Sequence, residues 1–362
     1  MALVGKRPQG HTLWGRDLEA VLACAENDLR TLSGKHILLT GCTGFMGKWI
    51  VESLIYANKK LHSAIHLHLL TRNKSRFLQN MNSALDTECL HFLECDIADL
   101  TPDLLPACDY IIHGSNLNND GSSSWAWRHM NSAVNGLQNV LAVADFFKSD
   151  RGILLSSGAS HAAVHNAAPT IHIKEPADFS TKELSEGNVY GLTKHFLEVM
   201  LAAWFSEGKT AFSIARCFTF LGAHMPLAGA QAAGNFFNDA LHGRAVCVKG
   251  DGRAVRSYMY GVDMVVALLA ILVRGQASRL YNVGSEKSVT IGEMAHMIAQ
   301  FANVPTSILN NAVVAGNAPS YYVPEVRSLE EQLGVNPVFS LDEALESTWH
   351  WLLQRHSAGS TI

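Results

Sequence analysis

Tyr190 and Lys194 are four residues apart in the segment Tyr190-Gly-Leu-Thr-Lys194. On a helix, that spacing places both side chains on the same face. A free tyrosine has a pKa of about 10 and is a poor base at neutral pH, but a nearby ammonium group and an oxidised nicotinamide would favour its phenolate. Tyr190 could then take a proton from a sugar or alcohol hydroxyl while hydride leaves the same carbon. A surface pair with no chemistry is the alternative, because this spacing is common.

A serine at the end of an apolar run strengthens the chemical interpretation. Ser157 closes the strand-like segment Leu154-Leu-Ser-Ser-Gly158. We expect its hydroxyl to hydrogen-bond the reacting oxygen and to hold that oxygen as it becomes a carbonyl. The predicted catalytic residues are Ser157, Tyr190 and Lys194.

Two histidines, His161 and His165, are also four residues apart. We interpret them as loop residues near the substrate. Either imidazole could assist proton transfer, because imidazole titrates near neutrality. No acidic third ligand is evident beside them, so no metal site is predicted.

A glycine-rich turn upstream could bind the cofactor that such chemistry needs. The segment His36-Ile-Leu-Leu-Thr-Gly-Cys-Thr-Gly-Phe-Met-Gly47 places three glycines between a buried strand and a helix. In a dinucleotide site the first glycine makes a tight turn, the second lets the backbone approach a pyrophosphate, and the third lets helix and strand pack closely. A glycine-rich turn without a ligand is the alternative. The residues predicted to bind the cofactor here are Gly41, Thr43, Gly44, Phe45, Met46 and Gly47.

The end of the second strand, Leu69-Leu-Thr-Arg-Asn73, bears on the choice of cofactor. NAD sites usually carry an acidic residue there for the adenosine ribose, and none is present. Arg72 could instead pair with a 2′-phosphate, so NADP is slightly favoured over NAD; a solvated basic loop is the alternative. Later strand ends should also run beside the cofactor, which Tyr190 and Lys194 should contact. The strand-end residues expected to bind it are Thr71, Arg72, Asp96, Ile97, His113, Gly114 and Ser115.

The elements that position these residues follow from apolar patterning. Continuous apolar runs alternate with helical patterns, which is typical of a parallel sheet covered by helices on both faces. An amphipathic helix over residues 13–32 comes first. Strands are predicted at residues 36–40, 65–71, 90–96, 110–114, 152–157 and 211–218, and helices at 48–57, 132–147 and 189–205.

The predicted fold class is α/β, a doubly wound parallel sheet of the Rossmann type with a smaller C-terminal substrate-binding lobe. Past residue 222 the alternation becomes less regular. We therefore expect a helical extension over residues 1–34 and a dinucleotide-binding domain over 35–222. Residues 223–362 should form mainly the substrate-binding lobe and return a strand and a helix to the first domain.

Composition excludes several other classes of protein. Of the 362 residues, 48% are hydrophobic and only 17% are charged, which excludes extensive disorder. A net charge of -4 without a basic stripe argues against nucleic acid as a partner. The longest apolar run, residues 264–273, is far short of the roughly 20 residues that cross a bilayer, so no membrane association is expected. Seven cysteines without a CxxC pair indicate no disulfide framework and a cytoplasmic location.

Together these motifs resemble the extended short-chain dehydrogenase/reductases of the nucleotide-sugar epimerase/dehydratase group. The resemblance begins at about residue 35 and covers nearly the whole remaining chain. It includes the Thr-Gly-x-x-Gly-x-x-Gly turn and the catalytic set. It also includes the segments Gly250-Asp-Gly-Arg-Ala-Val-Arg-Ser-Tyr258 and Tyr281-Asn-Val-Gly-Ser285.

The resemblance implies an NAD(P) cofactor and a nucleotide-diphosphate sugar as the substrate. Within that picture Ser157 would bind the sugar, and Arg256 and Asn235 would bind the diphosphate. Arg216 matches the arginine that ends the sixth strand in the group. Members commonly form homodimers through two long helices of each subunit, which correspond here to residues 132–147 and 189–205.

Two positions depart from the pattern of the group. Sugar 4,6-dehydratases usually carry an Asp-Glu pair directly after the catalytic hydroxyl residue, and here those places hold Gly158 and Ala159. Epimerisation through a transient 4-keto sugar therefore fits the residues better than dehydration. The alternatives are a dehydratase or ketoreductase with the same three catalytic residues, and a cofactor-binding sensor that performs no chemistry.

Overall fold

The computed structural model describes residues 13–79, 81, 86–117, 121–160, 189–229, 231–309 and 319–357. His161 and His165 lie outside the described residues. The helices, strands and contacts given for the protein are those of these ranges.

A seven-stranded sheet forms the centre of the molecule, and each pair of neighbouring strands in it is parallel. The strand order is β11-β6-β5-β4-β1-β2-β3. The chain order therefore reverses between β1 and β4, the position at which doubly wound sheets open a crevice for ligands. The predicted fold class is confirmed. The strands are β1 (His36–Thr40), β2 (His66–Thr71), β3 (Leu90–Glu94), β4 (Tyr110–His113), β5 (Arg151–Ser157), β6 (Ala211–Cys217) and β11 (Leu280–Val283).

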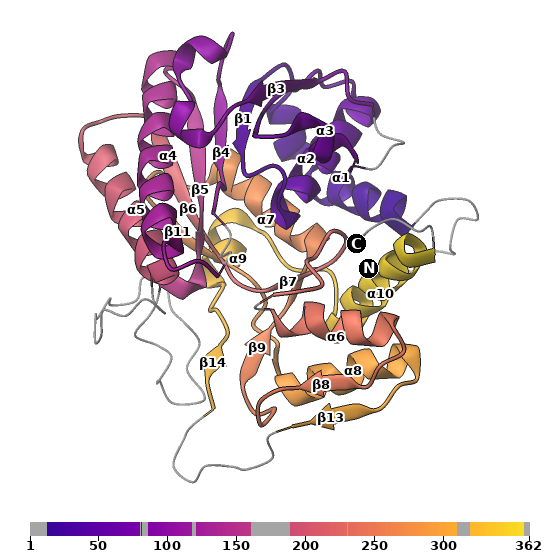
Figure 1. The fold of residues 1–362 in the computed structure, drawn as a ribbon. Coiled ribbons are helices and arrows are strands. Elements are labelled where there is room, and N and C mark those ends of the chain that lie inside the picture. The colour runs from indigo at the N-terminus through magenta and orange to yellow at the C-terminus, as the bar shows by residue number, and fades with distance from the viewer. Residues whose placement is uncertain are drawn as a thin grey trace.

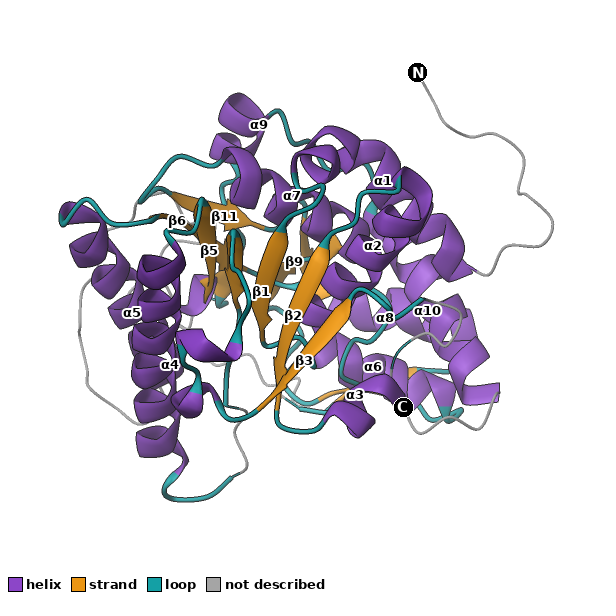
Figure 2. Ribbon diagram, turned by 90° about the horizontal axis from the view of Figure 1, so that it is seen from above, coloured by secondary structure: helices purple, strands orange, loops and turns teal. Residues whose placement is uncertain are grey.

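Helices cover both faces of this sheet (Figures 1 and 2). One face is covered by three helices that pack together, α1 (Leu13–Thr31), α2 (Phe45–Leu61) and α7 (Gly261–Arg274). The other face is covered by α4 (Trp125–Phe147) and α5 (Val189–Ser206). Burial on both faces explains why the strands are continuous apolar runs. Each face consequently has its own hydrophobic core.

The first helix is part of the larger core. Leu18, Val21 and Leu29 of α1 are at most 2% exposed and face α2 and α7. Arg274 of α7 also donates through Nε to Asp28 at 2.7 Å. Residues 13–31 therefore stabilise the main sheet domain by covering two of its helices.

Two helices are longer than predicted. α4 begins at Trp125 instead of residue 132, and α2 runs over Phe45–Leu61 instead of 48–57. The first turns of α4 contain Trp125 and His129, whose rings stack on each other. Stacked polar aromatics break the simple apolar stripe that predicts a helix, so the sequence pattern places the start of α4 too late.

A smaller lobe lies below the carboxyl ends of the central strands (Figure 1). Its three-stranded sheet has the order β12-β9-β14, and β13 pairs with β8. The remaining strands are β7 (Phe220–Leu221), β8 (Val246–Val248), β9 (Val255–Ser257), β10 (Met259–Tyr260), β12 (Ser288–Thr290), β13 (Thr306–Ile308) and β14 (Tyr321–Tyr322). The remaining helices are α3 (Lys74–Gln79), α6 (Ala232–Leu241), α8 (Ile291–Ala302), α9 (Arg327–Leu333) and α10 (Leu341–Ser357), with short 3-10 turns at Ile97–Asp99, Pro102–Leu104 and Gly158–Ser160.

Within the described ranges, every helix is too short or too polar to cross a membrane. Over the same ranges, no three His, Cys, Asp or Glu side chains are placed to share a metal ion.

Candidate active site

The glycine-rich turn between β1 and α2 places its three glycines in three different environments. Gly41 has a φ of +79°, and a Cβ there would lie 2.4 Å from the carbonyl oxygen of Gly114. A Cβ at Gly47 would lie 2.3 Å from the carbonyl oxygen of Gly41. A Cβ at Gly44 would make only ordinary van der Waals contact, 3.5 Å from the same oxygen, among the described atoms. The chain itself requires glycine at 41 and 47, whereas the open space at 44 fits the close approach of a ligand.

The N-terminus of α2 is suited to an anionic group. Its N-cap residue, Gly44, has no side chain to bond the first N–H groups, and the first turn contains no acidic residue. Free N–H groups and the positive end of the helix dipole favour a phosphate. Thr43 is exposed, and Phe45 and Met46 begin the helix half-buried. These residues therefore fit the pyrophosphate of a dinucleotide.

Arg72 and Asp96 follow β2 and β3 and lie close together. The side chain of Arg72 is 72% exposed, and its Nη1 is 4.0 Å from a carboxylate oxygen of Asp96. The other oxygen of Asp96 accepts a hydrogen bond from the Ala98 N–H at 3.1 Å. Ile97 is buried against Gly136 of α4, where an added Cβ would lie 2.8 Å from it. Arg72 is thus an exposed cation at the end of β2, with an acid as its neighbour.

Two other strand-end residues predicted to bind the cofactor are buried. Thr71 is 4% exposed, and His113 is 2% exposed with its Nδ1 2.8 Å from the Thr40 hydroxyl oxygen. Burial lowers the pKa of His113 to about 3, so this imidazole is neutral at physiological pH. Gly114 and Ser115 donate their N–H groups to the same hydroxyl at 3.3 Å. The His113 side chain therefore positions the β4 end from inside the protein.

Ser157, Tyr190 and Lys194 lie together where β5 ends and α5 begins. The Ser157 hydroxyl is close enough to Tyr190 to lower the pKa of its phenol, against the larger effect of burial. The Nζ of Lys194 is 6.0 Å from the centre of the Tyr190 ring and donates to the carbonyl oxygen of Leu155 at 3.0 Å. Burial lowers the pKa of Lys194 to about 8. The fold thus brings the three predicted catalytic side chains into one cluster.

The phenol of Tyr190 differs from the sequence expectation in one respect. Burial raises the pKa of Tyr190, and the Ser157 hydroxyl opposes that shift only in part. The neighbouring Lys194 was expected to lower this pKa, but its ammonium group is directed to the Leu155 carbonyl. Desolvation therefore dominates in the protein by itself. A further positive charge beside the ring would favour the phenolate.

A buried ion pair lies behind the cluster. Arg216, in β6, donates through Nε and Nη2 to the two carboxylate oxygens of Glu198 at 2.9 and 2.6 Å, and Ser156 donates to the same carboxylate at 2.6 Å. Burial raises the pKa of Glu198, but hydrogen bonds led by the one from Arg216 lower it to about 2. The pair fixes α5 against β5 and β6. Sequence reasoning missed Glu198, although its position one helical turn after Lys194 is a readable signal.

His129 also borders the site and was missed. Its side chain is 1% exposed, stacks on Trp125 with ring centroids 4.9 Å apart, and lies 5.8 Å from the ring of Tyr190. Burial lowers the pKa of His129, with a smaller effect of the Lys194 charge. Nothing in the sequence around His129 indicates this position, because α4 and α5 meet only in the folded chain.

Tyr322, also missed, brings a second phenol to the end of β5. A Cβ at Gly158 would lie 2.5 Å from its hydroxyl, and Ser157 opposes the rise in the pKa of Tyr322 that burial causes. Its ring centroid is 4.8 Å from that of Phe218, and the guanidinium carbon of Arg256 lies 5.9 Å from it. Tyr322 is also the strand partner of Arg256 between β14 and β9. Arg256 is therefore one ring away from the catalytic cluster.

The two residues predicted to bind the diphosphate have different surroundings. Nη1 of Arg256 donates to the carbonyl oxygens of Val255 at 2.7 Å and Ser320 at 3.2 Å. Asn235, in the first turn of α6, donates its side-chain amide to the carbonyl oxygen of Gly229 at 3.0 Å. The described contacts link Arg256 to the catalytic cluster and link Asn235 to the turn that precedes α6.

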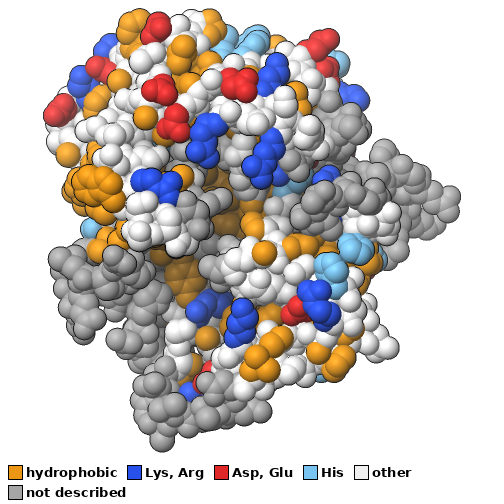
Figure 3. Space-filling model, in the orientation of Figure 1, with side chains coloured by type: hydrophobic (Ala, Val, Ile, Leu, Met, Phe, Trp, Pro, Cys, Tyr) orange, Lys and Arg blue, Asp and Glu red, His pale blue; other side chains and the backbone are white. Residues whose placement is uncertain are grey.

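The face shown in Figure 3 is hollowed between the sheet domain above and the lobe below. Hydrophobic side chains are visible in this hollow, and Lys and Arg side chains lie on both sides of it. An apolar recess with cationic rims suits a ligand that carries both rings and phosphates.

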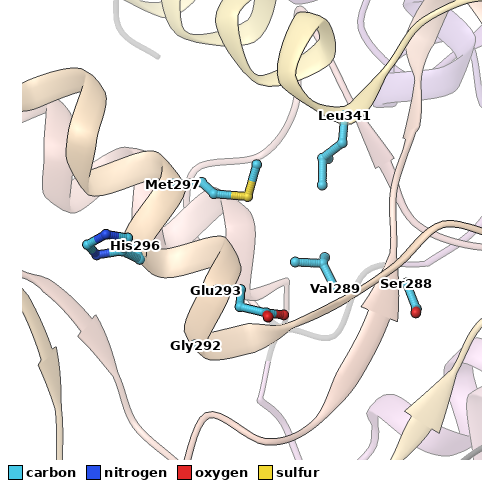
Figure 4. Close-up of a pocket in the computed structure, with 7 residues that line it drawn as sticks. All are labelled: Ser288, Val289, Gly292, Glu293, His296, Met297 and Leu341. Atoms are coloured by element: carbon cyan, nitrogen blue, oxygen red, sulfur yellow. The ribbon is translucent and has the colours of Figure 1, made fainter.

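A separate pocket of about 610 Å³ lies within the lobe, between β12, α8 and the start of α10 (Figure 4). The side chains of Val289, Met297 and Leu341 point toward one another across it, whereas His296 points away. None of the predicted cofactor, catalytic or substrate residues lines this pocket. The candidate active site is therefore at the strand ends.

Comparison with known proteins decides the family. The model of the NAD dependent epimerase/dehydratase family matches residues 37–284, a stretch that includes the glycine-rich turn and the catalytic cluster. The chain belongs to this family. The resemblance to nucleotide-sugar epimerases and dehydratases is thereby confirmed, and the protein is an enzyme of an NAD-dependent family.

Individual relatives of the chain are distant. UDP-glucuronic acid decarboxylase 1 of Xenopus tropicalis is 28% identical over 162 residues, which cover 45% of this chain and 38% of that protein. An epimerase of Methanothermobacter thermautotrophicus superposes with a TM-score of 0.78 at 22% identity, covering 93% of this chain and 97% of that one. The dTDP-glucose 4,6-dehydratase of Bacillus anthracis, solved in complex with NAD, gives 0.74 at 16% identity, with 90% and 98% covered. The two solved structures share the fold of this chain. The names of the three relatives describe three different reactions.

Proposed function

We propose that this enzyme epimerises a nucleotide-diphosphate sugar at C4 through a transient 4-keto sugar. The observation that carries the proposal is the environment of Gly158, where the sugar 4,6-dehydratases place an acid. A Cβ at this position would lie 2.5 Å from the Tyr322 hydroxyl and 2.6 Å from the Phe218 ring. The site has neither an acid at 158 nor room for one, so the proton transfers of dehydration lack their usual group.

In this mechanism the side chains of the enzyme would move a single proton, the one on the C4 hydroxyl of the sugar. Tyr190, as the phenolate, takes the proton of the C4 hydroxyl and returns it when the ketone is reduced from the other face. Ser157 donates to the reacting oxygen in both directions. Lys194, held on the Leu155 carbonyl, keeps a cationic group at the phenol ring. The reaction leaves the proton count of the enzyme unchanged.

The cofactor supplies an acceptor of hydride that later gives it back. The open space at Gly44 and the uncapped N-terminus of α2 would hold its pyrophosphate. Arg72 would pair with a 2′-phosphate and so favour NADP over NAD. Arg256 would bind the substrate diphosphate, because a half-buried guanidinium beside the catalytic cluster favours an anion.

The test is product analysis on a panel of UDP-, dTDP-, GDP- and CDP-sugars incubated with NAD or NADP. We expect an isomer of unchanged mass, separated by chromatography and identified by NMR, with no net consumption of cofactor. Tyr190→Phe serves as the inactive control. A product lighter by one water would identify a dehydratase instead. Stoichiometric oxidation of NADPH with a 4-keto sugar would identify a ketoreductase.

A further inference from the structure

We propose that four histidines on one face of β1, β2 and β3 form a pH-sensitive clasp, which holds the edge strand β3 in the sheet while they are neutral and releases it when mild acid protonates them. The clasp consists of His36, His66, His68 and His91. The inference rests on the proposed function only in taking the residues that follow β3, Asp96 and Ile97, as part of the cofactor site.

Strand pairing places the four side chains side by side. His36 is the partner of His66 at the start of β1 and β2, and His68 is the partner of His91 in β3. Residues that are directly opposite one another, or two apart in one strand, point to the same face of a sheet. The rings of neighbouring pairs are stacked, with centroids 4.4, 5.2, 5.1 and 5.6 Å apart. The clasp is therefore one continuous group of imidazoles across three strands.

Two contacts between ring nitrogens limit how many protons the clasp can hold. Nδ1 of His36 is 2.9 Å from Nε2 of His68, and Nδ1 of His66 is 3.4 Å from Nε2 of His91. In each contact one nitrogen donates its proton, and the accepting nitrogen must carry none. If both rings of a pair were protonated, two N–H groups would face each other and the contact would break. Each pair therefore accepts at most one extra proton while the strands stay joined.

The surroundings of the clasp do little to offset added positive charge. His68 is 1% exposed. Asp109, just before β4, is the acid that acts on His36, but it already accepts from the His36 backbone N–H at 2.7 Å and from Lys35 at 3.4 Å. The neighbouring Cys108 stays neutral, because burial raises the pKa of its thiol to about 12. Protonated imidazoles would thus mainly face one another, and like charges directly opposite each other destabilise strand pairing.

The same environment keeps the clasp neutral at physiological pH. Burial, followed by the charges of the other three imidazoles, lowers the pKa of His68 to about 4, and burial also lowers the pKa of His36. In an opened edge, where water reaches the rings, these values return toward about 6.5. The opened edge therefore binds protons more tightly than the closed one. Pairing of β3 is fully stable above about pH 6.5 and weakens as the pH falls toward about 4.

The experiment measures amide hydrogen exchange of β3 in the full chain by NMR, as protection factors that remove the intrinsic effect of pH. Between about pH 7.5 and about pH 5, the protection of wild-type β3 should fall by up to about thirtyfold, the ratio for one group whose pKa differs by the amount given for His68. His68→Gln keeps a polar partner for His36 but does not titrate, and it should lose most of this fall. His296→Gln removes an exposed histidine of α8 and is the control that should retain it.

A second variant covers the case in which His68→Gln does not fold. His66→Gln/His91→Gln changes one half-buried and one exposed side chain and removes two charges that act on His68. The NMR titration midpoint of the His68 imidazole should therefore rise. Global unfolding is not a substitute for these local readouts, because buried Asp17 and Asp263, whose pKa values burial raises, respond to pH in the opposite direction.

Three results would overturn the inference. They are equal β3 protection at both pH values in wild type, an equal fall in His68→Gln, and an unmoved His68 midpoint in the double variant. Calorimetric titration with NAD tests the link to the cofactor site, since affinity should fall in acid more for wild type than for His68→Gln; equal falls would overturn that link. The exchange measurement needs no ligand, so a chain that bound no dinucleotide would contradict the proposed function and leave the test of the clasp intact.

Discussion

The hydroxyl of Tyr260 donates a hydrogen bond to the carboxyl group of Asp17, with 2.7 Å between the oxygens and 243 positions between the residues. The bond joins α1 to the short strand that precedes α7. Asp17 is 5% exposed, and burial raises the pKa of Asp17 from 3.8 to about 7. The folded protein therefore holds this proton more tightly than the unfolded chain does.

A pH dependence of stability follows from this shift. Between about pH 4 and about pH 7 the folded state binds the extra proton, so the free energy of unfolding should fall as the pH rises through this window. Asp17→Asn should remove that part of the fall, which amounts to roughly 2–4 kcal/mol. Urea unfolding from about pH 5 to about pH 8 measures it. Asp28→Asn, on the same helix but in an ion pair with Arg274, is the control and should keep the slope.

Gly44→Ala should separate binding from folding. The variant should unfold within about 1 kcal/mol of wild type, since its Cβ makes only ordinary contact with the chain, and it should bind the dinucleotide at least tenfold more weakly. Gly47→Ala should instead be strongly destabilised, because its Cβ would overlap the Gly41 carbonyl. Thermal unfolding and calorimetric titration with NAD and NADP provide the two readouts. Full cofactor affinity in folded Gly44→Ala would contradict our assignment of the turn.

Arg72→Ala tests cofactor choice. The variant should lose affinity for NADP much more than for NAD, because only NADP carries the 2′-phosphate that the guanidinium would pair with. Because the Arg72 side chain is exposed, we expect the free energy of unfolding to change by less than about 0.5 kcal/mol. Equal losses for the two cofactors, or no loss for either, would refute the NADP preference.

Tyr190→Phe tests the mechanism. The variant should fold and bind cofactor and nucleotide sugar normally, yet transfer hydride about 10²–10⁴-fold more slowly, as is typical for loss of a general base. Lys194→Ala should also slow the step, and Ser157→Ala should cost less than Tyr190→Phe. Single-turnover reduction of bound cofactor by substrate follows the step. Wild-type hydride transfer in Tyr190→Phe would direct attention to His161 and His165.

The outer faces of α4 and α5 bear on assembly, because large apolar side chains remain exposed there. Trp127 of α4 is 71% exposed, and Phe196 and Val199 of α5 are 48% and 50% exposed. We propose that these helices form a homodimer interface. Light scattering at micromolar concentration should give a dimeric mass for wild type and a monomeric mass for the double variant Phe196→Glu/Val199→Glu. A monomeric wild type would end this proposal.

Much of the fold could be predicted because its signals are local. Apolar runs such as residues 36–40 and 211–217 form buried parallel strands, and the first of them leads through the glycine-rich turn into α2. The glycine spacing at 41, 44 and 47 matches the turn, since Gly41 and Gly47 meet backbone too closely for a side chain and Gly44 leaves open space. Tyr190 and Lys194 share a helix face wherever that helix packs. Helix starts were less predictable, as the early start of α4 shows.

The tertiary structure decided the relationships between distant segments. The Tyr322 hydroxyl lies against Gly158 at the end of β5 only because β14 pairs with β9. Packing also decides whether the pKa of Tyr190 rises or falls, because desolvation depends on the surroundings in the folded protein and not on the residue type. Periodicity in a sequence specifies which face of a helix or strand is buried. It carries no information about which side chain, distant in the sequence, packs against that face.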